Sequence, residues 1–234
     1  MEDYRAWALA QGAERIARAA GEPVSGRCRF QGDWCASPGA FGLASRRGAD
    51  PAAVAAALAR GTDLAGSWFD RAEALGGYVN LRLAPAWYGA VASAAVVPGP
   101  VAETAVPPCP AFPAALAPGD WKFLCRSAVG TVPPALAARQ DGENPAWLVR
   151  YTARRMAALA GRGGGEPPPV WAPGDRELLR LTAEYPARRR EPGPALGRYL
   201  AALARQLWRL EPVSGAVQRA CAGVLAAGYR QLSG

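Results

Sequence analysis

Residues 194–210 read PALGRYLAALARQLWRL, and their apolar side chains recur at the spacing of one helix face. This apolar stripe comprises Leu196, Tyr199, Leu200, Leu203, Leu207 and Leu210. Such spacing is typical of a helix that packs against other helices. Arg198, Arg205 and Arg209 follow one another at i, i+7 and i+11 on the opposite side. The stretch therefore predicts an amphipathic helix with one apolar face and one arginine face.

Three further helices are predicted around this one. Asn144-Pro145 begins a helix that runs to about Ala160, and Asp175 caps a second helix that Pro186 closes. Ser214 caps the last helix, whose apolar face comprises Val217, Cys221, Val224, Leu225 and Leu232. Short loops between amphipathic helices favour a bundle. We therefore predict an all-α helical bundle over residues 121–234.

The N-terminal half combines helical and strand patterns. Residues 2–20 predict a helix, Asp50-Pro51 predicts a helix start, and residues 78–83 alternate in polarity as a half-buried strand does. Seven prolines between residues 97 and 120 predict an extended connector, because proline fixes φ and cannot donate a backbone hydrogen bond. The predicted protein is mainly helical, with an α+β domain over residues 1–96, a Pro-rich linker and the bundle.

The composition excludes several classes of active site. The 234 residues include no histidine and a single lysine, Lys122. Histidine nucleophile pairs, histidine bases and histidine-ligated metals are therefore ruled out. The five cysteines are Cys28, Cys35, Cys109, Cys125 and Cys221. They form no C-x-x-C pair, and no glycine-rich phosphate loop is present. We expect no catalytic residue, no metal and no cofactor.

The net charge of +8 is concentrated in the C-terminal half. Residues 1–120 carry a net charge of −1, whereas residues 121–234 carry +9. This asymmetry favours a partner that has phosphates or an acidic surface. The first residues lack the pattern of a signal peptide, and prolines interrupt the uncharged residues 83–102. We therefore expect a cytoplasmic protein without a membrane partner.

Basic and aromatic side chains are interleaved on the helix that begins at the Asn-Pro pair. Arg150 and Arg154 lie one turn apart, Arg155 lies beside them, and Tyr151 and Trp147 offer stacking faces. Cations neutralise phosphates and rings stack on unpaired bases, so this pattern is typical of a single-stranded RNA site. We predict that the arginines face water. The alternative is a solvated helix face with both rings in the core.

Residues 144–155, NPAWLVRYTARR, resemble the helix that opens the anticodon-binding domain of arginyl-tRNA synthetases, known as the DALR domain. That family typically has Val-Gln-Tyr-Ala-His-Ala-Arg here, and Thr152-Ala153-Arg154 replaces its Ala-His-Ala. Later segments resemble the family's following helices in the same order, at residues 176–186, 196–204 and 217–233. The resemblance implies a tRNA-binding bundle of the anticodon-binding type.

The N-terminal half resembles the additional N-terminal domain of the same synthetases. Residues 32–37 and 49–58 carry part of the resemblance, and residues 77–83, GYVNLRL, resemble a strand of that domain. In the family this small α+β domain touches the elbow of the tRNA. The resemblance therefore implies that Tyr78 and Asn80 contact RNA.

The family's catalytic domain has no counterpart in this sequence. Only residues 84–143 separate the two resembling parts, and the His-Ile-Gly-His and Lys-Met-Ser-Lys signatures cannot be present. We therefore predict a non-catalytic protein that binds tRNA or another structured RNA. The predicted RNA-binding residues are Arg150, Tyr151, Arg154, Arg155, Arg198, Arg205, Arg209, Tyr78 and Asn80.

Two alternatives are consistent with the same residues. In one, the protein is a paralogue that pairs with a synthetase or another protein. In the other, it is an accessory subunit that completes an arginine–tRNA ligase together with a separate catalytic chain, so that arginyl-tRNA aminoacylation would belong to the assembly.

Overall fold

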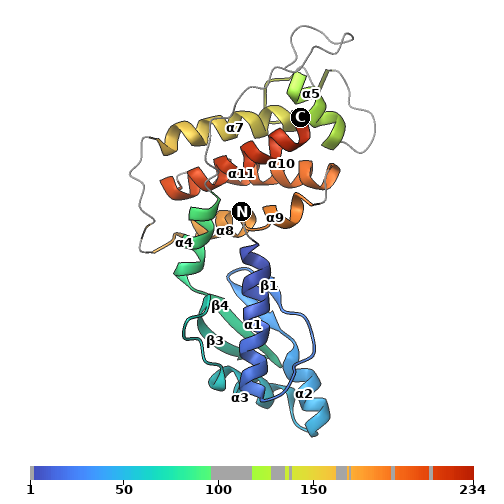
Figure 1. The fold of residues 1–234 in the computed structure, drawn as a ribbon, viewed down its shortest axis with the longest axis vertical. Coiled ribbons are helices and arrows are strands. Elements are labelled where there is room, and N and C mark those ends of the chain that lie inside the picture. The colour runs from blue at the N-terminus through green and yellow to red at the C-terminus, as the bar shows by residue number, and fades with distance from the viewer. Residues whose placement is uncertain are drawn as a thin grey trace. The chain divides into compact units, whose positions relative to one another are not determined.

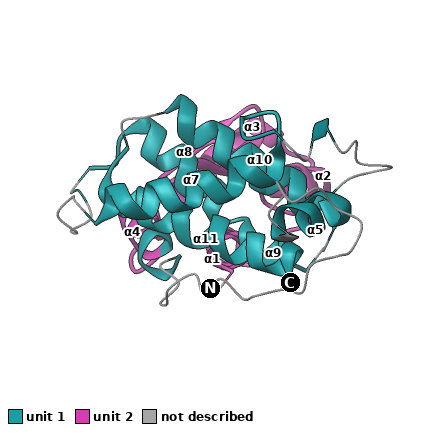
Figure 2. Ribbon diagram, turned by 90° about the horizontal axis from the view of Figure 1, so that it is seen from above, with its two compact units in different colours: residues 1–2, 91–234 teal, residues 3–90 magenta. Residues whose placement is uncertain are grey.

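The structure is a computed structural model of the chain. It describes residues 3–95, 118–127, 135–136, 139–161, 168, 170–190, 193–210 and 213–234. The chain divides into two compact units, coloured separately in Figure 2. We call residues 3–90 the N-terminal unit and the described residues from Val91 onward the C-terminal unit. Most of the predicted connector over residues 97–120 lies outside the described residues, which leave out residues 96–117.

The N-terminal unit is an α+β fold built on one antiparallel sheet (Figure 1). Its elements are α1 (Tyr4–Ala20), β1 (Arg29–Gln31), β2 (Trp34–Ser37), α2 (Gly39–Arg47), α3 (Pro51–Gly61), β3 (Phe69–Leu75) and β4 (Tyr78–Leu83). The strand order is β1-β2-β4-β3. The predicted strand over residues 78–83 is confirmed as β4. It is an inner strand that pairs with β2 on one side and β3 on the other.

Alternation in β4 sets the core of this unit. Val79, Leu81 and Leu83 are buried, while the residues between them lie on the other face. A Cβ atom at Gly12 of α1 would lie 3.3 Å from Leu81 Cδ1, so a glycine lets this helix approach the sheet closely. The core therefore lies between the sheet and its helices.

The hairpin between β3 and β4 depends on two glycines. Gly76 and Gly77 have φ values of 53° and 85°, which side chains larger than glycine rarely adopt. Two such residues suit a tight turn between antiparallel strands. This turn places Tyr78 at the very start of β4, at the end of the sheet.

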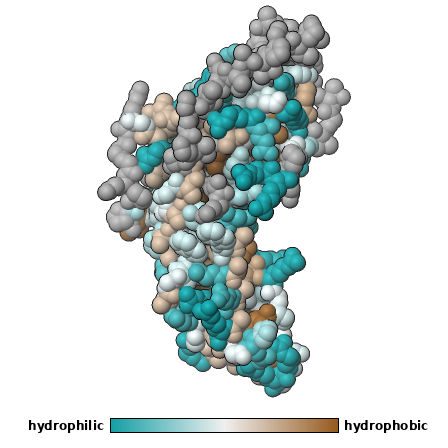
Figure 3. All heavy atoms as spheres, viewed as in Figure 1, coloured by the Kyte–Doolittle hydropathy of each residue, from teal (hydrophilic) through white to brown (hydrophobic). Residues whose placement is uncertain are grey.

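The C-terminal end of α2 carries two arginines, and both pair with a glutamate of the same unit. Arg46 and Arg47 donate to the two carboxylate oxygens of Glu22 at 2.9 and 2.6 Å. These hydrogen bonds lower the pKa of Glu22. Hydrophilic residues gather over α2 in the space-filling view (Figure 3).

The described residues of the C-terminal unit form a bundle of helices. After α4 (Pro85–Ala94), which contains the division between the units, its helices are α5 (Pro118–Ser127), α7 (Pro145–Ala160), α8 (Pro173–Thr182), α9 (Tyr185–Arg188), α10 (Pro194–Arg209) and α11 (Gly215–Ser233). Helix α11 packs against α5, α7, α8 and α10. The predicted helical C-terminal part is thus confirmed. None of the helices in the described part of the chain combines the length and apolar character needed to cross a bilayer.

Two of the predicted helix starts are confirmed at their caps. Asn144 Oδ1 accepts from the backbone N–H groups of Ala146 and Trp147 at 3.0 and 3.2 Å. Ser214 Oγ accepts from Val217 N at 3.4 Å. Each cap supplies an acceptor to first-turn donors that have no partner within the helix.

The predicted bounds of the second helix are wrong. Asp175 does not cap it, because α8 begins at Pro173 and the buried Asp175 side chain accepts from Ser214 N at 3.1 Å. Pro186 does not close it either, since α8 ends at Thr182 and Pro186 lies in the first turn of α9. Proline suits a first turn, where its missing N–H group would have no partner within the helix.

Helix α5 is an addition to the predicted bundle. It begins at Pro118, inside the segment predicted as a linker. Phe123 is fully buried and stacks on Tyr229 of α11, with ring centroids 5.7 Å apart. This packing, rather than a strong repeat in the sequence, makes residues 118–127 part of the C-terminal unit.

Candidate nucleic-acid interface

Three aromatic rings from α7 and α10 form a stack on the C-terminal unit. Trp147 and Tyr151 lie one turn apart on α7, with centroids 4.6 Å apart and planes within 7°. Trp208 of α10 lies 6.0 Å from Tyr151, with planes within 13°. Tyr151 is 40% exposed and Trp208 is 37% exposed. We call these three rings the aromatic stack.

The position of Trp208 is fixed by two groups from α7. Its indole Nε1 donates to Oγ1 of the buried Thr152 at 2.9 Å. The Arg155 guanidinium carbon lies 4.2 Å from the centroid of the indole ring. A cation over an indole face is attracted by the negative charge of that face. Arg155 therefore helps to hold Trp208 in the aromatic stack.

A cavity of about 510 Å³ adjoins the aromatic stack. It is lined by Gln140, Asp141, Gly142, Trp147, Leu148, Arg205, Trp208 and Arg209. Its size is typical of sites for small ligands or single groups of larger ones. Because two arginines and two indoles share it, the cavity suits a flat ring joined to an anion.

One part of the cavity wall, residues 140–142, is a loop held by its own hydrogen bonds. Asn144 Nδ2 donates to the carbonyl oxygen of Arg139 at 2.8 Å. The backbone N–H of Asn144 donates to the carbonyl oxygen of Asp141 at 3.1 Å. Hydrogen bonds from the Glu143 N–H and from Arg139 lower the pKa of Asp141. The cavity therefore has one fixed wall that carries an ionised carboxylate.

Arg150 is partly buried, with 25% of its side chain exposed, rather than facing water as predicted. Its Nε and Nη2 atoms donate to the two carboxylate oxygens of Asp120 at 2.9 and 2.8 Å. Asp120 is 4% exposed and also accepts from Tyr229 Oη at 2.5 Å. Helix α5, which was not predicted, supplies this carboxylate. The arginine is thus committed to a contact between helices, and the prediction that it is exposed is wrong.

The other predicted arginines have different positions. On α7, Arg154 is exposed as predicted, whereas Arg155 is partly buried against Trp208, so its predicted exposure is wrong. Arg198, Arg205 and Arg209 are all exposed on α10, which confirms their predicted face. Only the last two line the cavity, because Arg198 lies two helical turns before Arg205. RNA binding by any of them stays a prediction.

Tyr78 and Asn80 belong to the N-terminal unit. The exposed Tyr78 ring meets Phe41 edge-on, with centroids 5.2 Å apart. Asn80 lies between Ala36 of β2 and Glu73 of β3. The two side chains lie on the sheet face that does not form the core, as expected from their spacing in β4.

Trp208 is the main site residue that the sequence analysis missed. It lies three residues after Arg205 and directly before Arg209, so the arginine face of this helix also carries it. A search of that face for rings, rather than for charges alone, would have identified it.

Within the described ranges, no group of three or more cysteine, aspartate or glutamate side chains is placed to hold a metal ion. Comparison with known proteins gives no match to a family model, a curated protein or a solved structure. The aromatic stack and the cavity are therefore the observations on which a function can be argued.

Proposed function

We propose that the C-terminal unit binds unpaired RNA, first of all the anticodon loop of a tRNA, and does so without catalysis. The observation that carries the proposal is the cavity in which Trp147 and Trp208 lie next to Arg205 and Arg209. The tRNA preference rests on the resemblance of residues 144–155 to an anticodon-binding helix. The absence of histidine supports a role in binding alone.

The chemistry of the cavity favours single-stranded over duplex RNA. An unpaired base can leave its neighbours and stack on an indole ring, which contributes about 1–3 kcal/mol per base. The phosphate next to that base carries the charge that an arginine attracts. Bases inside a duplex are already stacked on each other, so they cannot use the rings.

We further propose that the N-terminal unit supplies a second, weaker contact through Tyr78 and Asn80. Tyr78 is exposed and Asn80 lies on the same face of β4. Arg82, which shares this face, pairs with Asp70 at 2.7 Å. Because this charge is already paired, the expected contact is through ring and amide groups and depends little on salt.

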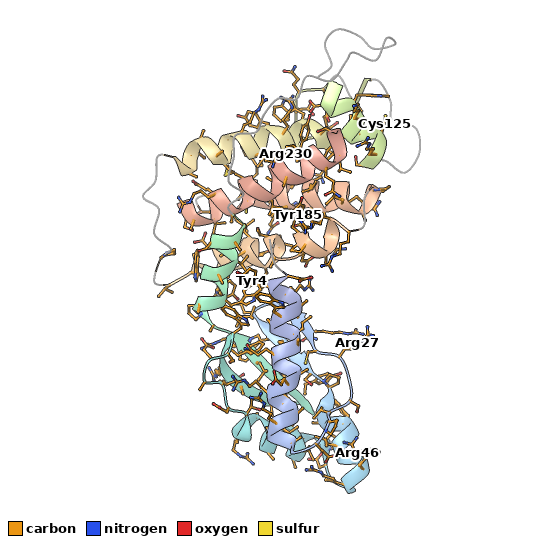
Figure 4. All side chains as sticks on the ribbon, in the orientation of Figure 1. Tyr4, Arg27, Arg46, Cys125, Tyr185 and Arg230 are labelled. Atoms are coloured by element: carbon orange, nitrogen blue, oxygen red, sulfur yellow. The ribbon has the colours of Figure 1, made fainter. Side chains whose placement is uncertain are left out.

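The test of the electrostatic part is a salt series with a fluorescent anticodon stem-loop. Replacing Arg205 and Arg209 together with Gln should flatten the dependence of log K on log salt by about 1.4, since each phosphate contact in single strands contributes about 0.7. The matched control replaces Arg27 and Arg60, two exposed arginines of the N-terminal unit. Arg27 extends away from the ribbon in Figure 4. The control removes the same charge and should leave the slope unchanged.

The test of the stacking part is Trp147→Ala beside Trp147→Phe. The alanine variant should lose about 1–3 kcal/mol of binding free energy with little change in the salt slope, and phenylalanine should restore part of it. The thermal unfolding midpoint of each variant shows whether weaker binding comes from the lost ring contact or from loss of the folded structure. If wild type, the double Gln variant and Trp147→Ala all bind equally weakly, the RNA proposal is wrong and a protein partner becomes the better explanation.

A further inference from the structure

Cys28 and Cys35 lie close together in the hairpin of β1 and β2. The register pairs Phe30 with Cys35, so these two residues lie on the same face of the sheet. Cys28 precedes Phe30 by two residues and therefore points to that face as well. The face is buried: Cys35 is 0% exposed and Cys28 is 8% exposed. Two thiols are thus held against the core, one on β2 and one on the residue directly before β1.

The two sulfurs differ in acidity because of their contacts. The Cys35 thiol donates a hydrogen bond to Cys28, and the Ser37 side chain also hydrogen-bonds Cys28. These bonds lower the pKa of Cys28 to about 7, whereas the Cys28 interaction and burial raise the pKa of Cys35. A Cβ atom at Gly12 would lie 3.4 Å from Cys35 Sγ, so α1 covers the second sulfur. Cys28 is therefore the more acidic of the two thiols.

Cys28 lies nearer the edge of the sheet than Cys35 does. Strand β1 is three residues long and forms the edge of the sheet, pairing with β2 alone. Short edge segments open locally at a small free-energy cost. Cys28 directly precedes this strand, so local opening of this edge would expose its sulfur to a small oxidant while Cys35 stays beneath α1.

We propose that Cys28 and Cys35 are a peroxide-oxidisable dithiol that closes to a disulfide between β1 and β2. The Cys28 thiolate attacks hydrogen peroxide, the O–O bond breaks, and the leaving hydroxide takes a proton to give water and a Cys28 sulfenic acid. Cys35 then attacks the Cys28 sulfur, the S–O bond breaks, and the hydroxide leaves as water with the Cys35 proton. Two thiols lose two electrons in all, and one peroxide becomes two waters.

The wild-type chain gives a direct test. The folded protein is treated with hydrogen peroxide, its remaining thiols are alkylated during denaturation, and it is digested with trypsin without reductant. Cleavage after Arg27 and Arg29 should yield the dipeptide of residues 28–29 linked to the peptide that begins at Phe30 and contains Cys35. A reductant should release the link. This readout does not depend on whether any variant folds.

Other cysteines of the same sample are internal references. Cys125 is exposed on α5, where Figure 4 labels it, and should be oxidised without joining Cys28. Cys221 is fully buried and has a pKa raised to about 12, so it should stay reduced. Cys109 lies outside the described residues, and a link to it would give a different peptide.

Single variants then test the order of the two steps. In Cys35→Ser the Cys28 sulfenic acid cannot be resolved and should be trapped by dimedone, whereas Cys28→Ser should leave Cys35 unmodified. Circular dichroism confirms that each variant is folded. The proposal is overturned if peroxide that fully oxidises Cys125 leaves both cysteines reduced, or if Cys28 pairs with a cysteine other than Cys35.

Discussion

The carboxylate of Asp120 shows how one buried acid decides the role of an arginine. Arg150 contacts it through two nitrogen atoms, and Tyr229 donates to one of the same oxygens. A planar guanidinium matches a carboxylate in this two-bond geometry. The contact joins α5, α7 and α11. Arg150 therefore holds helices together, although its neighbours on α7 remain in the proposed RNA site.

Replacing Arg150 with Gln should lower the free energy of unfolding by more than it lowers the free energy of RNA binding. The variant leaves the Asp120 charge buried without its cation, which should lower the free energy of unfolding by up to about 3 kcal/mol. Arg198→Gln, on the exposed face of α10, should change it by less than about 0.5 kcal/mol. Urea denaturation followed by circular dichroism measures both. Equal stability of the two variants would show that the Asp120 contact contributes nothing.

Tyr229 should make the protein sensitive to alkali. Burial and the hydrogen bond to Asp120 raise its pKa above the ordinary value of about 10. The unfolded tyrosine ionises near pH 10 while the folded one stays protonated, so its contribution to stability is complete below about pH 10 and is lost as pH rises above it. Thermal midpoints between about pH 8 and about pH 11 should fall less steeply in Tyr229→Phe. An unchanged slope in that variant would refute this assignment.

At the scale of elements, the start of α7 also positions the wall of the cavity. Asn144 accepts from two first-turn N–H groups through Oδ1 and donates to the carbonyl oxygen of Arg139 through Nδ2. One side chain therefore fixes both where the helix begins and how the preceding loop folds. The helix and the loop that line the cavity are set by the same residue.

Asn144→Ala should lower the free energy of unfolding by about 1–2 kcal/mol through loss of the cap. Asn144→Asp keeps the cap acceptor and loses only the donor to Arg139, so it should cost less than the alanine variant. Chemical denaturation of the two variants at neutral pH makes the comparison. If aspartate proves as costly as alanine, the loop bond rather than the cap carries the effect.

At the scale of the whole molecule, each unit has a core of its own. Leu81 and Phe69 belong to the core of the N-terminal unit, whereas Leu200 and Leu225 belong to that of the C-terminal unit. The positive charge excess lies in the second part of the sequence, over residues 121–234. The two units therefore differ in architecture and in charge.

Hydrogen exchange should report the two units separately. Asn144→Ala should speed amide exchange in α7 and in its neighbours α10 and α11, because these helices pack on one another. Exchange in β2 and β4 should not change. Mass spectrometry of peptic peptides gives both readouts from one sample. A matching increase in the sheet would mean that the chain unfolds as a single cooperative body.

The sequence by itself determined the elements whose signals are local. Asn144 and Ser214 mark helix starts, and the alternation over residues 78–83 marks β4, because caps and periodicity involve neighbours within one turn or one strand. The same periodicity placed Arg205 and Arg209 on the exposed face of their helix.

Only the tertiary structure decided which groups meet across helices. Helix α5, the pairing of Arg150 with Asp120, and the position of Trp208 on Tyr151 all depend on contacts between residues far apart in the chain. Periodicity shows which side of a helix is polar, but it carries no information on which distant helix brings a carboxylate or an indole to that side. For that reason the exposed positions of Arg205 and Arg209 were predictable, while the pairing of Arg150 with Asp120 was not.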